Sequence, residues 1–250
     1  PRPRRGAPRH GGASGRTMRR VLLLRPTGGP VAGADLLVTH RVVPVPAALA
    51  ETAAYTAEGA ILVVSSLNAV DMLSDAPEGN LLVRPFRLVV SAGAGTSRAL
   101  EAAGVAEVVT PDPPGAVGIL AELARRGESG RLLWPRGSDA DVAPLSELAS
   151  RGFEVTAPIV YVKEPLTALD ARTLSAFRAG EYDALAIGSL AALDVFLSAL
   201  GASAARELPP VRFGVLGPET ARLLVARGFP EPSVPAKPLL TDLIALLKEA

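Results

Sequence analysis

The sequence predicts an α/β protein built from two similar lobes with parallel sheets. Short apolar runs suit buried parallel strands, and segments with a helical apolar pattern separate most of them. One phrase occurs twice, because "ILVVSSLNAVDML" at 61–73 resembles "ALAIGSLAALDVFL" at 184–197. With 250 residues, of which 48% are hydrophobic, the chain is long enough for two domains with buried cores.

The expected strands follow one another along the whole chain. They lie at 21–24, 61–64, 88–90, 106–109, 131–134, 184–187, 211–216 and 232–234. Two helices stand out by their leucine stripes, which we expect to be core. One runs to Leu200 and ends at Gly201, and the other closes the chain with Thr241 as its cap.

Two further pairs of segments extend the repeat. The stretch "RLVVSAGAGTSRALEAAG" at 87–104 resembles "RFGVLGPETARLLVARG" at 212–228, and "RVLLLRPTGG" at 20–29 resembles "RLLWPRGSDA" at 131–140. Each half thus contains a strand and turn, a serine motif and a Gly-x-x-Thr motif. Such self-similarity indicates two equivalent α/β lobes.

Two extended, proline-bounded segments, "HRVVPVP" and "APIVYVKEP", are expected to join the lobes. The expected layout is a discontinuous lobe of 18–40 plus 166–250, connector strands at 41–46 and 158–165, and a continuous lobe at 47–157. We expect a ligand cleft between the two lobes, since two-domain α/β proteins usually bind ligands there.

Residues 1–17 differ in composition from the rest, with five arginines and no acidic residue. We expect a disordered basic tail without function; nucleic-acid binding and a transit peptide are the alternatives. The remaining chain has 21 basic and 25 acidic side chains, which does not favour a nucleic-acid partner. No apolar run approaches the roughly 20 residues that span a bilayer, so we expect a cytoplasmic protein without a membrane partner.

Several kinds of catalytic site are unsupported. The chain has no cysteine and two histidines, so a metal site or a Ser–His–Asp triad would depend on His40. The stretch "GAGTSRA" has Arg98 where a dinucleotide-binding motif has its third glycine, and no P-loop occurs. We therefore expect neither a metal nor a cofactor.

Both serine motifs and both Gly-x-x-Thr motifs lie at the carboxyl end of an expected strand, directly before a helix. Free backbone N–H groups and the positive helix end attract anions there. We expect Ser66, Thr96, Ser189 and Thr220 to bind a ligand with several carboxylates. The alternative is that these four residues only cap their helices.

Tyr161 lies on a connector strand, where its phenol can donate a proton to a departing hydroxyl. Lys163 projects to the same side of the strand and can pair with ligand carboxylates. The alternatives are a tyrosine packed against one lobe and a solvated lysine.

The order of these motifs resembles the uroporphyrinogen-III synthase family over nearly all of 18–250. The matching pieces are "VLLLRP", "VVSSLNAV", "GAGTSRAL", "LLWPRG", "LSELASRGFEVTAPIVY", "YDALAIGSLAALDVFL" and "VLGPETARLLVARG". The resemblance implies two α/β lobes joined by a two-stranded connector. It also implies a lyase that needs no cofactor.

The reaction implied by the resemblance takes hydroxymethylbilane, a linear polycarboxylated tetrapyrrole, as its substrate. The terminal hydroxyl leaves, and the ring closes through a spiro intermediate with the last ring inverted. Tyr161 matches the family tyrosine that assists the departure of the hydroxyl. The expected substrate-binding residues are Arg25, Ser65, Ser66, Asn68, Gly93, Thr96, Lys163, Ser189, Leu190, Gly217 and Thr220. A monomer is expected.

Three departures from the family pattern keep a second hypothesis open. Leu24 replaces a threonine beside the Arg-Pro pair, and Ser65 and Gly188 replace threonines before the two serines. The region between Arg25 and Pro44 is short and rich in glycine where the family has a full first helix and a second strand. A two-lobe binding or regulatory relative with weak or no catalysis is therefore the alternative.

Overall fold

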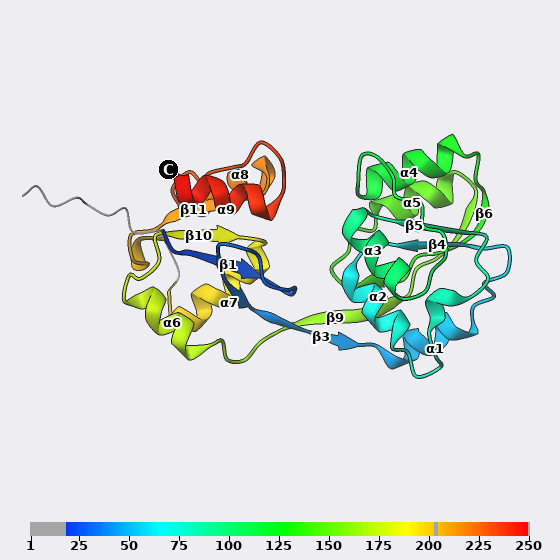
Figure 1. Cartoon of the computed structure of the whole chain (residues 1–250), viewed down its shortest axis with the longest axis horizontal. Coiled ribbons are helices and arrows are strands. Elements are labelled where there is room, and N and C mark those ends of the chain that lie inside the picture. The colour runs from blue at the N-terminus through cyan, green and yellow to red at the C-terminus, as the bar shows by residue number, and fades with distance from the viewer. Residues whose placement is uncertain (1–18, 203–204, 250) are drawn as a thin grey trace, which may run out of the picture. The chain divides into compact units, whose positions relative to one another are not determined.

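The structure is a computed structural model that describes residues 19–202 and 205–249. The expected tail at 1–17 lies outside these residues. The chain divides into two compact units (Figure 1). Unit 1 combines the chain up to Thr39 with the chain from Thr167 onward, whereas unit 2 is the continuous segment His40–Leu166.

Unit 1 contains a four-stranded, wholly parallel sheet with the strand order β11-β10-β1-β2. Its strands are β1 (Val21–Arg25), β2 (Asp35–Val38), β10 (Ala184–Ile187) and β11 (Arg212–Val215). Its helices are α6 (Ala171–Arg178), α7 (Leu190–Leu200), α8 (Pro218–Ala226), α9 (Leu240–Glu249) and the short 3₁₀ helix η2 (Ala205–Glu207).

Helices cover both faces of the unit 1 sheet. On one face, Leu243, Ile244 and Leu247 of α9 pack on Val21 and Leu23 of β1. In Figure 1, α9 lies on one side of β1 and β10, and α6 and α7 lie on the other. This coverage explains why β1 and β10 are continuous apolar runs instead of alternating ones.

Unit 2 contains a second four-stranded parallel sheet, with the order β5-β4-β6-β8. Its strands are β4 (Ile61–Val64), β5 (Leu88–Ser91), β6 (Gly130–Leu133) and β8 (Phe153–Thr156). Its helices are α1 (Pro46–Ala54), α2 (Leu67–Ser74), α3 (Ala94–Ala102), α4 (Ala116–Arg125), α5 (Ala143–Ser150) and the 3₁₀ helix η1 (Leu81–Val83).

The alternating side chains of β4 divide the core of unit 2 between two faces. Leu62 and Val64 pack with residues of α2 and α3, such as Leu73. Ile61 and Val63 pack on the other face with residues of α4 and α5. Figure 1 shows the same division, with α2 and α3 on one side of the sheet and α4 and α5 on the other.

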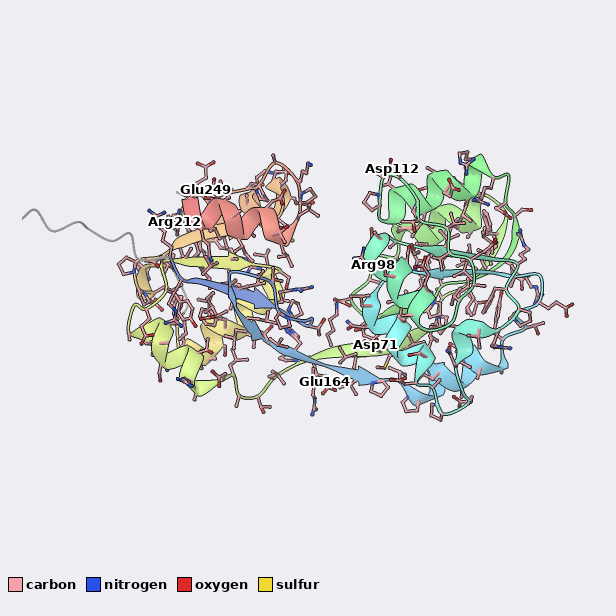
Figure 2. All side chains as sticks on the ribbon, viewed as in Figure 1. Asp71, Arg98, Asp112, Glu164, Arg212 and Glu249 are labelled. Atoms are coloured by element: carbon pink, nitrogen blue, oxygen red, sulfur yellow. The ribbon has the colours of Figure 1, made fainter. Side chains whose placement is uncertain are left out.

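A third, three-stranded sheet in unit 2 has the order β3-β9-β7. In it, β3 (His40–Pro44) pairs antiparallel with β9 (Ile159–Pro165), and β7 (Arg136–Gly137) pairs parallel with β9. Glu164, labelled in Figure 2, bonds to Arg41 of β3 at 2.6 Å.

The two parallel sheets confirm the repeat inferred from the sequence. The serine motif follows β10 in unit 1 and β4 in unit 2. In its sheet, β10 lies between β11 and β1, and β4 lies between the corresponding strands β5 and β6. A single further bridge extends each sheet, Gly214 with Ser233 in unit 1 and Val90 with Val109 in unit 2. The two units therefore have the same fold.

Three local expectations are wrong. The segments 106–109 and 232–234 form one bridge each and no strand, because prolines that lack an N–H flank them (Pro111 after the first, Pro232 and Pro235 around the second). Thr241 is not the cap of the last helix, which already begins at Leu240.

The link between β1 and β2 contains no helix within the described residues. The second strand, which the sequence analysis expected to be missing from this region, is present as β2 and pairs with β1. The link runs from residue 26 to residue 34, and Gly28 and Gly33 in it have positive φ values of 120° and 86°. Among the described residues, no helix has both the length and the apolar character needed to cross a membrane.

Candidate functional site

Ser66 and Ser189 take the same place in the two units. Each is the N-cap of the helix that follows its strand, with φ and ψ of −147° and 151° at Ser66 and of −161° and 156° at Ser189. Each Oγ accepts the N–H three residues on, from Ala69 at 3.1 Å and from Ala192 at 3.2 Å. The alternative that the serines are helix caps is therefore correct for both, which does not exclude a second role.

The two Gly-x-x-Thr motifs also begin helices, but their threonines are not caps. Gly93 and Gly217 are the N-cap residues of α3 and α8, where no side-chain cap is present. Thr96 and Thr220 are each the third residue of the helix; Thr96 is buried and Thr220 is half-buried. The first-turn N–H groups of α3 and α8 thus have no side-chain acceptor and can bind an anion.

Tyr161 lies in the core of unit 2 and is 3% exposed. Its Oη lies 3.0 Å from Ser66 Oγ, so β9 and the start of α2 meet at this pair. A β-carbon on Gly137 would lie 2.6 Å from Cζ of the ring, so the tyrosine fits only because β7 has a glycine there. The phenol is therefore held in one place by packing.

Ser65 is a half-buried residue between β4 and its cap Ser66, and it has a partner that the sequence did not reveal. Trp134 Nε1 donates to Ser65 Oγ at 3.0 Å, and Trp134 is 5% exposed. Since a hydroxyl that accepts one hydrogen bond keeps its own proton, Ser65 can donate that proton to a ligand.

The equivalent turn of unit 1 is built on a close approach between strands. Gly188 donates its N–H to Leu24 O at 2.8 Å, and a β-carbon on Gly188 would lie 2.7 Å from the same oxygen. This contact leaves room for a glycine and for no larger residue at this position. Arg25 folds toward Gly28, where a β-carbon would lie 2.8 Å from its guanidinium carbon.

Lys163 is already paired within unit 2. Its Nζ donates to Asp139 at 2.8 Å and lies 5.9 Å from the centre of the Tyr161 ring. Lys163 and Tyr161 thus lie on the same side of β9, as expected. The remaining expected residues, Asn68 and Leu190, lie in the first turns of α2 and α7, and both are half-buried.

His40 is a buried titratable residue that the sequence analysis considered only for a metal site or a triad. In the pairing of β3 with β9, His40 lies opposite Pro165 and Tyr161 lies opposite Pro44, so the two residues lie at opposite ends of the paired segment. Burial, and after it the positive charge of Lys163, lowers the pKa of His40 below 6.5. The residue is neutral at neutral pH.

Sequence reasoning missed Trp134, Gly137 and Asp139, which support the expected residues from β6, β7 and the loop after them. The available signal was the stretch "WPRGSD", which follows an expected strand as "RPTGG" follows its equivalent. The actual contacts span 24 to 69 residues of sequence, so spacing alone could not assign them.

The structure brings Tyr161, Ser66 and Lys163 together in unit 2, and it places Ser65, Asn68, Gly93 and Thr96 at helix starts of the same unit. Arg25, Ser189, Leu190, Gly217 and Thr220 belong to the corresponding edge of unit 1. Such edges can bind carboxylates, and a buried phenol can transfer a proton. Among the described residues, no three or more His, Cys, Asp or Glu side chains form a group that could hold a metal ion.

Comparison with solved structures shows the same fold. Uroporphyrinogen-III synthetase from Helicobacter pylori 26695 matches with a TM-score of 0.64 at 16% identity, over 92% of this chain and 98% of that one. A mutant uroporphyrinogen III synthase from the extremely thermophilic bacterium Thermus thermophilus matches with a TM-score of 0.53 at 19% identity, over 92% and 96% of the chains. A comparison with curated protein sequences gives no match.

The family model described as uroporphyrinogen-III synthase HemD matches residues 35–245. The match begins at the first residue of β2, directly after the link that lacks a helix. It covers far more than half of the chain, which therefore belongs to the uroporphyrinogen-III synthase family of cyclising lyases.

Proposed function

We propose that this protein cyclises hydroxymethylbilane to uroporphyrinogen III, with loss of water and inversion of the D ring. The observation that carries the proposal is the family match over residues 35–245. The internal repeat supports it, because each unit offers its own row of helix starts to a substrate with many carboxylates.

In this proposal, the substrate carboxylates bind at the carboxyl edges of both parallel sheets. The first turns of α3 and α8 begin at Gly93 and Gly217 and offer backbone N–H groups without a side-chain cap. Ser65 adds a hydroxyl proton in unit 2, since its oxygen already accepts from Trp134. These contacts fix the fold of the linear substrate, so that the inverted ring reacts first.

In this proposal, Tyr161 donates its phenol proton to the terminal hydroxyl of the substrate, which then leaves as water. Its phenol is buried and fixed by packing, which supports directed proton transfer in place of exchange with water. The reaction is a loss of water followed by ring closure, so it needs no electron acceptor. We propose that turnover requires no added cofactor, with the expectation that a chelator leaves the rate unchanged.

The test uses the full chain and freshly generated hydroxymethylbilane, and separates the uroporphyrin isomers after oxidation. We expect isomer III, formed faster than the spontaneous reaction forms isomer I. Tyr161→Phe should lower the rate by about 10²-fold or more, the usual worth of a general acid. Tyr55→Phe is the matched control, because the buried Tyr55 hydroxyl has no hydrogen-bond partner among the described residues. Equal rates for both variants would remove Tyr161 from the chemistry.

A binding or regulatory relative without turnover is the second candidate. The observation that favours it is the link at residues 26–34, which joins β1 to β2 without a helix where the family has one. The same assay decides, because isomer I at the spontaneous rate would leave a protein that binds the substrate without converting it.

We also propose that the protein acts as a monomer in the cytoplasm, with the small-molecule substrate as its partner. Each unit covers both faces of its own sheet with its own helices, which supports a monomer. The polycarboxylated substrate requires an aqueous compartment, which supports the location. Light scattering of the full chain at assay concentration tests the oligomeric state.

A further inference from the structure

The hydroxyl of Ser66 has two partners inside unit 2. The N–H of Ala69 donates to its Oγ at 3.1 Å, and Tyr161 Oη lies 3.0 Å away. A serine hydroxyl has one proton and two lone pairs. One lone pair is occupied by the amide, so the contact with Tyr161 uses either the proton or the other lone pair.

The direction of this bond decides where the phenol proton points. An oxygen that accepts an amide N–H becomes a better donor, since hydrogen bonds in a chain strengthen one another. The chain Ala69 N–H to Ser66 to Tyr161 therefore favours donation from Ser66 to the phenol oxygen. The proton of Tyr161 is then free to be donated elsewhere.

The phenol cannot move away from Ser66 without disturbing the strands around it. Its ring lies against Gly137, where a β-carbon would come within 2.8 Å of Oη. Within the described residues, Ser66 is the one side chain that hydrogen-bonds to this oxygen. The close contacts thus fix the pair as a unit.

Ser189 shows that capping alone does not require such a partner. It has the same extended conformation and the same bond to the third helical N–H, at 3.2 Å. It caps α7 without a tyrosine bonded to it among the described residues. The bond to Tyr161 is therefore an addition found in unit 2 and separate from the cap.

We propose that Ser66 is a positioning residue for Tyr161, which donates its hydroxyl proton to Oη, directs the phenol proton to the leaving hydroxyl, and stabilises the phenolate that remains. This inference rests on the proposed function. It replaces the expectation that Ser66 donates to a substrate carboxylate, because its single proton is already used. Ser65 retains that role.

The proton transfers balance over the reaction. When the C–O bond breaks, its electron pair leaves with oxygen, which takes the proton of Tyr161 and departs as water. The substrate becomes a pyrrole-stabilised cation, and Tyr161 becomes a phenolate bonded to Ser66. Ring closure then releases one proton from a pyrrole carbon, and that proton returns to the phenolate.

The experiment compares Ser66→Ala with Ser189→Ala in the full chain, because both variants lose the same kind of cap. Each is assayed for kcat, KM and their pH dependence, and the ¹³Cζ shift of Tyr161 is recorded by NMR with Tyr161→Phe as the assignment. We expect Ser66→Ala to lower kcat by about tenfold or more, the effect of one lost hydrogen bond to a developing charge. We also expect it to move the alkaline limb of the kcat profile and the ¹³Cζ shift.

Ser189→Ala should change KM and leave the alkaline limb and the Tyr161 shift unchanged. Ser66→Thr keeps the hydroxyl, so we expect the alkaline limb of its kcat profile and its Tyr161 ¹³Cζ shift to match those of the wild type. The proposal is overturned if Ser66→Ala alters only KM, or if the Tyr161 shift does not respond to it. If the wild type forms no isomer III, the proposed function fails and with it the catalytic role of Ser66. The NMR comparison still decides whether Ser66 bonds to Tyr161.

Discussion

The turns after β4 and β10 have the same backbone conformation and different surroundings. In unit 2, the two serines at the turn bond to Trp134 and Tyr161, whereas in unit 1 the corresponding pair is Gly188 and Ser189, packed against a carbonyl of β1. The repeat therefore preserved the helix start and changed the side chains around it. In our proposal, unit 2 contains the proton donor Tyr161, whereas unit 1 only binds carboxylates of the substrate.

The largest effect should come from placing a threonine in the turn of unit 1. Gly188→Thr would place a β-carbon 2.7 Å from Leu24 O, so the strand ends must separate. We expect a loss of about 1–3 kcal/mol in the free energy of unfolding, as for other overpacked positions. Urea unfolding of the full chain measures it.

Ser65→Thr is the control for that change, because this turn already accommodates a β-carbon. Its effect should be under about 1 kcal/mol, the usual range for a surface-near substitution. Equal losses for the two variants would mean that the two turns do not differ in the space they offer.

An intermediate effect is expected from Trp134→Phe, which removes the N–H that bonds to Ser65. The lost hydrogen bond should account for about 1 kcal/mol of the cost, and the space that the smaller ring leaves in the core adds to it. A double-mutant cycle with Ser65→Ala isolates this hydrogen bond. Because each single variant already lacks the bond, the loss in the double variant differs from the sum of the two single losses, and that difference is the coupling energy. A coupling energy of zero would contradict the asymmetry between the turns.

The smallest effect concerns His40, which lies at the opposite end of the β3–β9 pairing from Tyr161. Its pKa is lowered in the folded protein, so the unfolded chain binds more protons just below pH 6.5. The free energy of unfolding should therefore fall as the pH drops through this range. His40→Gln should reduce the fall relative to the wild type. Equal pH dependence in the variant and the wild type would contradict a lowered pKa of His40.

Much of the fold could be predicted because parallel strands buried on both faces are continuous apolar runs. The strands 61–64 and 184–187 and the helix that ends at Leu200 agree with the structure residue for residue. The edge strands β2 and β8 were missed because both are partly exposed and have little apolar sequence, three consecutive residues in β2 and two residues separated by Glu154 in β8.

The site could be predicted only at the level of its backbone. A serine after an apolar run identifies a helix start in either unit, and both serines are caps. Ser66 also contacts Tyr161, which lies 95 positions further along the chain, and a glycine in β7 leaves room for the ring. Local sequence contains no information about such a contact.

The interrupted course of unit 1 has a consequence for synthesis on the ribosome. Unit 2 is one continuous stretch whose first and last strands pair, so it can fold as soon as it has emerged. In unit 1, β1 lies between β2 and β10, and β10 is made more than 150 residues after β1. Strand β1 must therefore wait for its neighbour β10 until unit 2 has been synthesised.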